Sequence, residues 1–194
     1  YHEMSSRRSI REFSSQEIPE GVLENIIKTA STAPSGAHKQ PWFFALITSA
    51  EMKRKIRDAA EKEEYENYHG RMSKDWLKDL EKFNTNWQKP FLEIAPALIV
   101  IFKQTYEETE NGKAKNYYVN ESVGIAAGML IAAIHQAGLV TLTHTPSPLN
   151  FLADLLGRPK NEKPFLLLPV GFAADKTQVP LLKRKSFTEV AKLF

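Results

Sequence analysis

Four segments of the chain carry the hydrophobic spacing of helices. They predict helices at residues 18–32, 51–69, 118–136 and 149–156. Pro19 and Ser49 stand where helices commonly begin, and Gly138 follows the third segment as a typical helix end. The longest apolar run, residues 123–134, is too short to span a bilayer. We therefore expect it to lie in a buried helix at the centre of the fold.

Four shorter segments are rich in β-branched and aromatic side chains. They predict strands at residues 42–48, 97–102, 139–145 and 165–172. The second is apolar throughout, which is typical of a strand buried on both faces, whereas the third alternates. Residues 105–115 are polar and turn-forming, and we expect a loop there. Helices and strands in mixed order predict an α+β fold with three layers.

Two polar segments remain. Residues 64–90 interleave charged and aromatic side chains, and composition alone favours a solvated connection. Within it, Trp76, Leu80 and Phe83 share helical spacing, so we expect them to pack the segment against the body of the protein. Residues 175–194 are polar and punctuated by proline, which indicates an arm lying over the surface.

Length and composition indicate one globular domain, residues 1–194, with 42% hydrophobic and 25% charged residues. A net charge of +3 is too small and too dispersed to indicate nucleic-acid binding. The chain has no cysteine, so redox chemistry would require a bound cofactor. Without an apolar leader or a membrane-spanning run, we expect a soluble, cytoplasmic protein. The start at Tyr1 leaves open an N-terminal anchor removed from the chain.

Several classes of site find no support. The five histidines lack the spacing of a zinc site, and no metal is expected. There is no glycine-rich phosphate loop and no serine nucleophile motif. Gly124 and Gly128 lie in the apolar helix, where their expected role is close helix packing.

Donor-rich segments near both ends of the chain could bind an anion. Arg7, Arg8 and Arg11 place three guanidinium groups within five residues, although taken alone they are better explained as a solvated basic terminus. Residues 33–42 form a proline-bracketed loop that can present backbone N–H groups, or can simply connect two elements. Residues 183–185 add three further cations.

The segments RRSIREF, TAPSGAHKQPW and LTHTP resemble the flavin-dependent nitroreductase superfamily. This resemblance implies FMN as cofactor, a three-layer fold with a central mixed sheet, and a homodimer with FMN at the interface. The segments EYENYHGRMSKDW, TNWQKPFLEIAPALIVIFKQ and VPLLKRK are similar, more narrowly, to the iodotyrosine deiodinase family. There, residues 64–90 correspond to a helical lid over the substrate.

The resemblance also implies site residues. For FMN they are Arg7, Arg8, Ser9, Arg11, Pro34, Ser35, Gly36, Thr143, His144, Thr145 and Arg184. The Thr145 hydroxyl is the best candidate to bond flavin N5, and His144 stands where a threonine is usual. For substrate they are Ala37, Glu64, Tyr68 and Lys89. The backbone N–H of Ala37 would face the phenolate oxygen, which makes Ala37 and Thr145 the catalytic candidates.

The implied reaction is FMN-dependent reductive dehalogenation of mono- and diiodotyrosine to tyrosine and iodide. Glu64 and Tyr68 share a helix face, and Lys89 would add the opposite charge, so the three match an amino-acid zwitterion. A halogen beside the hydroxyl lowers the phenol pKa below the value of about 10 for tyrosine, so the site would select the phenolate. Electrons would come from an NADPH-dependent reductase or from reduced flavin.

Two alternatives remain open. One is a general FMN-dependent nitroreductase or flavin reductase that acts on another aromatic substrate. The other is a flavin-binding or anion-binding module without catalysis. The polar composition of residues 64–90 also predicts that this lid is poorly ordered until a zwitterion bridges Glu64 and Lys89.

Overall fold

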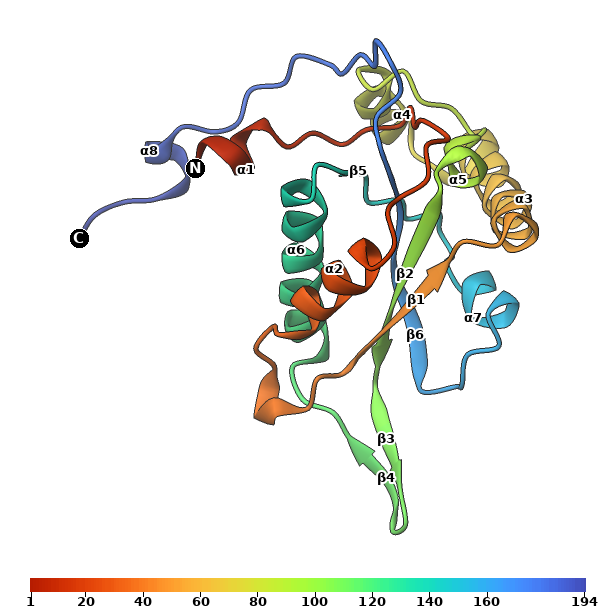
Figure 1. Ribbon diagram of the computed structural model, residues 1–194, viewed down its shortest axis with the longest axis vertical. Helices are drawn as coiled ribbons and strands as arrows, with labels where there is room; N and C mark the ends of the chain where they lie inside the picture. The colour runs from red at the N-terminus through yellow and green to blue at the C-terminus, as the bar shows by residue number, and fades with distance from the viewer.

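A computed structural model describes residues 1–194 and shows a four-stranded central sheet (Figure 1). The strands are β1 (Trp42–Ile47), β2 (Ala97–Gln104), β5 (Val140–Thr141) and β6 (Glu162–Gly171), in the order β1-β2-β6-β5. Neighbouring strands pair antiparallel, and an isolated parallel bridge joins Ser9 to Thr141. Because the sheet has both kinds of pairing, it is mixed, as predicted.

Helices cover both faces of this sheet. On one face lie α2 (Val22–Ser31) and α6 (Val119–Gln136), and on the other lie α3 (Ala50–Glu66), α5 (Phe91–Ile94) and α7 (Phe151–Leu155) (Figure 1). Each side has its own hydrophobic core. On β2, Ile99 and Ile101 belong to the first core, and Leu98 and Val100 belong to the second. Alternate side chains of β2 thus enter different cores, which explains its unbroken apolar sequence and confirms the three-layer α+β fold.

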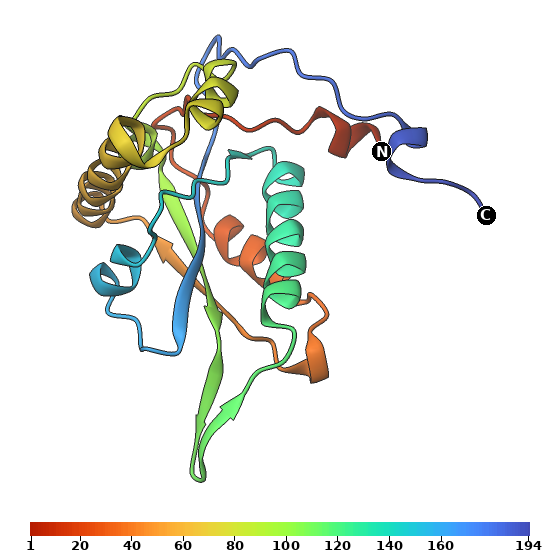
Figure 2. The same ribbon diagram turned by 180° about the vertical axis from the view of Figure 1, so that it is seen from behind.

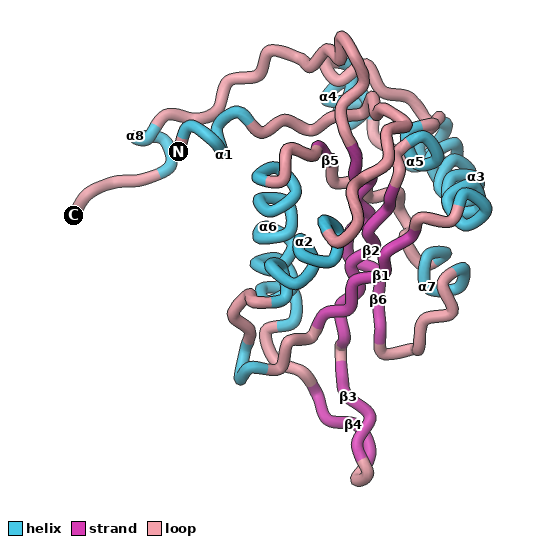
Figure 3. The backbone as a smooth tube through the Cα atoms, in the orientation of Figure 1, coloured by secondary structure: helices cyan, strands magenta, loops and turns pink.

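The predicted loop at residues 105–115 is instead a β-hairpin, which projects from the body (Figure 3). Its strands are β3 (Tyr106–Thr109) and β4 (Gly112–Lys115). The positive φ of 105° at Gly112 allows the tight turn, and the Lys113 ammonium lies 4.5 Å from the Tyr106 ring centre across the pair. Glutamates rarely favour strands, so composition concealed this element.

Other boundaries differ less from expectation. The strand predicted at 139–145 pairs regularly only over β5, with a further bridge between His144 and Leu167. The helix predicted to reach residue 69 ends at Glu66 and continues as the π-helical turn η2 (Asn67–Arg71). Short elements complete the chain: α1 (His2–Ser6), the 3₁₀ turn η1 (Gly36–His38), α4 (Lys74–Glu81) and α8 (Phe187–Val190).

Helix α6 is buried along one side only. Val123, Leu130 and Ile134 are fully buried in the first core. On the opposite side Ile125 is 48% exposed, and nothing lies within 4 Å of a Cβ built on Gly124 or Gly128. The close helix packing expected at these glycines therefore has no partner within this chain.

The C-terminal arm runs beside the N-terminal segment. Both views of the ribbon show the two ends of the chain lying next to each other, away from the sheet (Figures 1 and 2). The arm exposes large apolar side chains, with Leu181 at 98% and Leu193 at 86% exposure. No helix in the structure combines the length and hydropathy needed to cross a membrane.

Candidate active site

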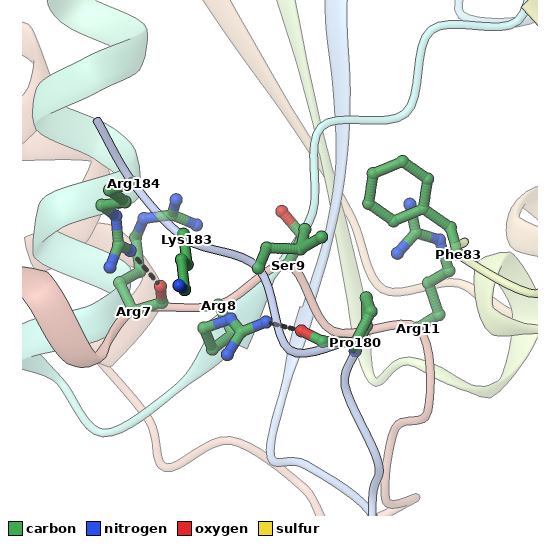
Figure 4. A pocket seen from close by; sticks show the side chains of 9 residues that line it. Arg7, Arg8, Ser9, Arg11, Phe83, Pro180, Lys183 and Arg184 are labelled. Atoms are coloured by element: carbon green, nitrogen blue, oxygen red, sulfur yellow. Dashed lines mark hydrogen bonds between the residues drawn. The ribbon is translucent and has the colours of Figure 1, made fainter. Parts of the chain in front are cut away.

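A cationic cavity of about 270 Å³ lies between the two ends of the chain (Figure 4). It is lined by Arg7, Arg8, Ser9, Arg11, Phe83, Pro180, Leu182, Lys183 and Arg184. This lining has five cations and no carboxylate, and none of the five cations forms an ion pair elsewhere in the chain. Such uncompensated charge suits a bound anionic group such as a phosphate.

Hydrogen bonds from arginine side chains to backbone carbonyl oxygens join the two chain ends around this cavity. Arg184 donates a hydrogen bond of 2.7 Å to the carbonyl oxygen of Ser5. Figure 4 shows two more, from Arg184 to the Arg7 carbonyl at 2.9 Å and from Arg8 to the Pro180 carbonyl. The Ser9 bridge to Thr141 fixes the N-terminal segment at the edge of the sheet. The arginines noted near the N-terminus and the cations near the C-terminus therefore form one cluster.

A second cavity, of about 150 Å³, adjoins the first and shares Arg11 with it. Its lining is Arg11, Glu64, Tyr68, Met72, Trp76, Leu80, Thr85, Lys89, Phe91, Leu142, Thr143, His144 and Thr145. The structure thus brings the three predicted substrate contacts Glu64, Tyr68 and Lys89 into one cavity with Thr143 and Thr145.

Glu64 and Lys89 form a buried ion pair in this cavity. The Lys89 ammonium lies 3.5 Å from a Glu64 carboxylate oxygen and 5.2 Å from the Tyr68 ring centre. The two charged side chains are only 8% and 5% exposed. Burial raises the pKa of Glu64 and lowers the pKa of Lys89, while each charge opposes the shift of the other. Interactions with both charges are strong here because water is excluded.

The aromatic stripe of the lid borders the cavities. We expected Trp76, Leu80 and Phe83 to pack against the body, and this is wrong for Trp76, which is 52% exposed. Trp76 and Leu80 line the second cavity, and the Phe83 ring centre lies 5.2 Å from the Arg11 guanidinium carbon. Helical spacing correctly predicted that these residues share one face, but in the structure that face borders the cavities.

His144 differs in exposure from its neighbours Thr143 and Thr145. The two threonines are exposed, whereas His144 is buried and packs edge-on against Phe91 with ring centres 5.5 Å apart. Its Nε2 atom has no hydrogen-bond partner. His144 is therefore a buried member of the second cavity's lining that contacts Phe91, a residue of the second core.

Replacing His144 by glutamine is expected to make folding less sensitive to acid. Burial, followed by the charges of Lys89 and Arg11, lowers the pKa of His144 from 6.5 to about 3. Below pH 6.5 the unfolded chain takes up a proton that the folded chain does not, so the free energy of unfolding falls as pH falls. From pH 7.5 to 5 this loss is about 2 kcal/mol. Urea unfolding at both pH values should show this loss of about 2 kcal/mol in the parent and not in His144→Gln. Equal losses in the two proteins would contradict the lowered pKa of His144.

The loop Pro34–Ala37 lies away from both cavities, and none of its residues lines either one. The Gly36 N–H donates to Ser122 Oγ at 3.2 Å near the start of α6, whereas His135 near its end bonds Ser6 Oγ at 3.0 Å. Ser122 and His135 are 13 positions apart, which corresponds to about 20 Å along the helix axis. The loop and the arginine cluster thus lie at opposite ends of α6 (Figures 1 and 2).

The loop itself has an unusual backbone. Ala37 and His38 have positive φ angles of 50° and 55°, which are uncommon for residues other than glycine. A Cβ added to Gly36 would lie 2.9 Å from the Tyr118 ring and 3.0 Å from the Tyr117 carbonyl oxygen. Only glycine fits at position 36 without displacing the loop. Backbone strain such as the positive φ angles of Ala37 and His38 is common at functional sites.

Comparison with known proteins places this geometry in a family. Residues 4–172 match the nitroreductase family. The chain is 60% identical over 195 aligned positions to an iodotyrosine deiodinase of Haliscomenobacter hydrossis, covering 100% of this chain and 88% of that protein. The chain belongs to the iodotyrosine deiodinase family. A Hydra vulgaris member of the same family is 49% identical, with 98% of this chain and 71% of that protein covered.

Solved structures agree with membership of the deiodinase family. A crystal structure of an oxidised iodotyrosine deiodinase bound to FMN and 3-iodo-L-tyrosine superposes with a TM-score of 0.83 at 28% identity. The match covers 96% of this chain and 95% of that one. A BluB-like flavoprotein of Clostridium difficile, at 21% identity and a TM-score of 0.75, shares the fold, with 100% of this chain and 97% of that chain covered.

Sequence reasoning missed several residues that border the site. Pro180 and Thr85 were not assigned to it, and Lys183 was noted only as one of the three cations at residues 183–185, yet each lines one of the two cavities. Lys183 carried a signal, because it stands in a run of three cations. Pro180 and Thr85 carried none, since only the tertiary fold brings the arm and the lid to the cavities.

Proposed function

We propose that this deiodinase-family chain is an FMN-dependent enzyme that removes halide from halotyrosines, with mono- and diiodotyrosine as substrates. The observation that carries the proposal is the joining of two cavities through Arg11. One concentrates five uncompensated cations, and the other contains the buried Glu64 and Lys89 pair. An anionic cofactor and a zwitterionic amino acid would each find matching charges, side by side.

The residues present fit FMN. Arg7, Arg8 and Arg184 provide guanidinium donors for the phosphate, and Arg11 continues the cationic lining toward the second cavity. The exposed hydroxyls of Thr143 and Thr145 border that second cavity, and we assign Thr145 to N5. Reduced FMN, when bound, supplies the two electrons of the reaction.

The lid residues would hold the amino-acid end of the substrate. The Glu64 carboxylate would accept hydrogen bonds from the α-ammonium group, and Lys89 and Tyr68 would donate to the α-carboxylate. A substrate bound this way would keep water away from Glu64 and Lys89, so its charge-assisted hydrogen bonds to them would be strong. The reaction replaces a carbon–halogen bond by a carbon–hydrogen bond. It consumes two electrons and one proton and releases halide.

We propose that the active unit is a homodimer with FMN at its interface. The Ala37 N–H, assigned to the phenolate, is about 20 Å along α6 from the arginine cluster of the same chain. The loop Pro34–Ala37 would therefore serve the site of the partner subunit. The exposed face of α6 around Ile125 and the apolar side chains of the arm offer the surface that such a dimer would bury.

Electron delivery and cell location stay predictions. We expect an NADPH-dependent reductase or reduced flavin to supply the electrons, and a cytoplasmic location. Among the alternatives, a general nitroreductase or flavin reductase is less favoured, because a neutral nitroarene has no group for the buried Glu64 and Lys89 pair to bind.

The proposal is tested by halide release. We expect the purified protein to be yellow and to bleach with dithionite. With dithionite kept in excess to reduce the flavin again after each step, it should release two iodide ions from each diiodotyrosine at a cost of four electrons, measured with an iodide electrode. A nitroarene serves as the comparison substrate. A chain that binds reducible FMN but releases no iodide would disprove the deiodinase assignment, and one that never binds flavin would disprove the cofactor assignment as well.

A further inference from the structure

Glu61 contacts the lid at the point where the lid returns to the body. Its carboxylate oxygen accepts a hydrogen bond of 2.6 Å from the backbone N–H of Lys89, which lies 28 residues further along the chain. Glu61 stands on α3 one turn before Glu64, so it shares a helix face with the anionic half of the clamp. Helix α3 therefore carries Glu64 and, through Glu61, also binds the backbone N–H of Lys89.

A network of buried and half-buried charges fixes the Glu61 carboxylate. Arg57 Nε donates to the same Glu61 oxygen at 2.8 Å, and Arg57 Nη1 donates to Glu93 at 3.0 Å. Hydrogen bonds to both carboxylates raise the pKa of Arg57, with that to Glu61 the larger cause. The Lys53 ammonium donates to the carbonyl oxygens of Glu93 and Ala95, at 3.0 and 2.7 Å. These contacts bind α5, which begins just after Lys89, to α3.

An ordinary surface ion pair on the same helix looks different. Glu51 and Lys55 are also four residues apart and 2.6 Å from each other, but their side chains are 66% and 51% exposed, and they pair with each other within one helix. Glu61 is 16% exposed and binds a distant backbone N–H. Losing Glu61 would leave that N–H without its partner and free the return end of the lid to shift.

We propose that Glu61 is a positioning residue of the substrate clamp, which fixes the Lys89 backbone so that its ammonium faces Glu64 across the cavity. This inference rests on the proposed deiodinase function. Glu61 lines neither cavity, so it acts through Lys89 and does not touch substrate. Because Glu61 positions Lys89, which would bind the substrate carboxylate, replacing Glu61 should weaken the binding only of ligands that carry an amino-acid group.

The test compares Glu61→Ala with Glu61→Gln and with the control Glu51→Ala. For Glu61→Ala we expect KM for diiodotyrosine to rise about 10- to 100-fold, the size of a lost hydrogen bond to a charged group. Turnover of 2-iodophenol, which lacks the amino-acid group, should be unchanged, as should FMN affinity. Glu61→Gln keeps an acceptor oxygen and should stay within about threefold of the parent. Glu51→Ala should match the parent throughout.

Either of two kinetic results would overturn the proposal. One is an unchanged KM for diiodotyrosine in Glu61→Ala, and the other is an equal loss with diiodotyrosine and 2-iodophenol, which would indicate general damage to the fold. Tryptic cleavage at Lys74, Lys78 and Lys82 provides a readout without catalysis, and Glu61→Ala should be cut faster than Glu51→Ala. If the parent released no iodide, the deiodinase function would fail, and equal cleavage of the two variants would still overturn the role of Glu61.

Discussion

Replacing Lys89 by methionine is expected to raise KM for diiodotyrosine about 100-fold while FMN stays bound. The substitution removes the cation that would bind the substrate carboxylate, and a charge-assisted hydrogen bond contributes about 1.5–3 kcal/mol. FMN should remain because Lys89 does not line the cationic cavity. Steady-state iodide release and titration of flavin fluorescence measure the two effects separately.

The same substitution should also destabilise the protein, because it leaves the Glu64 carboxylate buried without its partner. Removing one member of a buried pair costs about 3–5 kcal/mol in the free energy of unfolding. Adding Glu64→Gln should recover much of this stability, since neither position of the pair then carries a charge, but it should not recover substrate affinity. Recovery of both in the double variant would show that the pair holds the fold together and does not bind substrate.

Mixing two inactive variants is expected to restore activity if the site is shared between subunits. Arg8→Gln removes a cation from the cofactor cavity, and Gly36→Val forces the Pro34–Ala37 loop away from Tyr118. Each homodimer should release little iodide. In a mixed dimer one site would take both changes and the other neither, so random assembly should give about a quarter of the parent activity.

Co-expression with two different affinity tags allows the mixed dimer to be isolated and assayed. Arg8→Gln co-expressed with a differently tagged copy of itself is the control, and it should stay inactive. If the mixed dimers are no more active than the more active of the two variant homodimers, the shared site is contradicted, because a site built within one chain cannot be repaired by a partner. A monomer on a sizing column would contradict it too.

Local sequence was enough for most of the secondary structure. The hydrophobic periods of α2 and α3 and the apolar runs of α6 and β2 arise because these side chains are buried on folding, so these elements can be recognised in the sequence. The β3–β4 hairpin had no such repeat, because its strands lie on the surface and bury little. Where burial is slight, the sequence pattern carries little information about pairing.

The sequence by itself determined the layered fold and the residue types of the site, since the arginines, the Glu64 and Tyr68 spacing and the loop at residues 33–42 can be read locally. Tertiary structure decided which of these residues meet. It joined the chain ends into one cationic cavity, paired Glu64 with Lys89, placed Glu61 on the Lys89 backbone and kept the Pro34–Ala37 loop apart. Such contacts join residues 25 to about 180 positions apart, and no local pattern specifies distances of that kind.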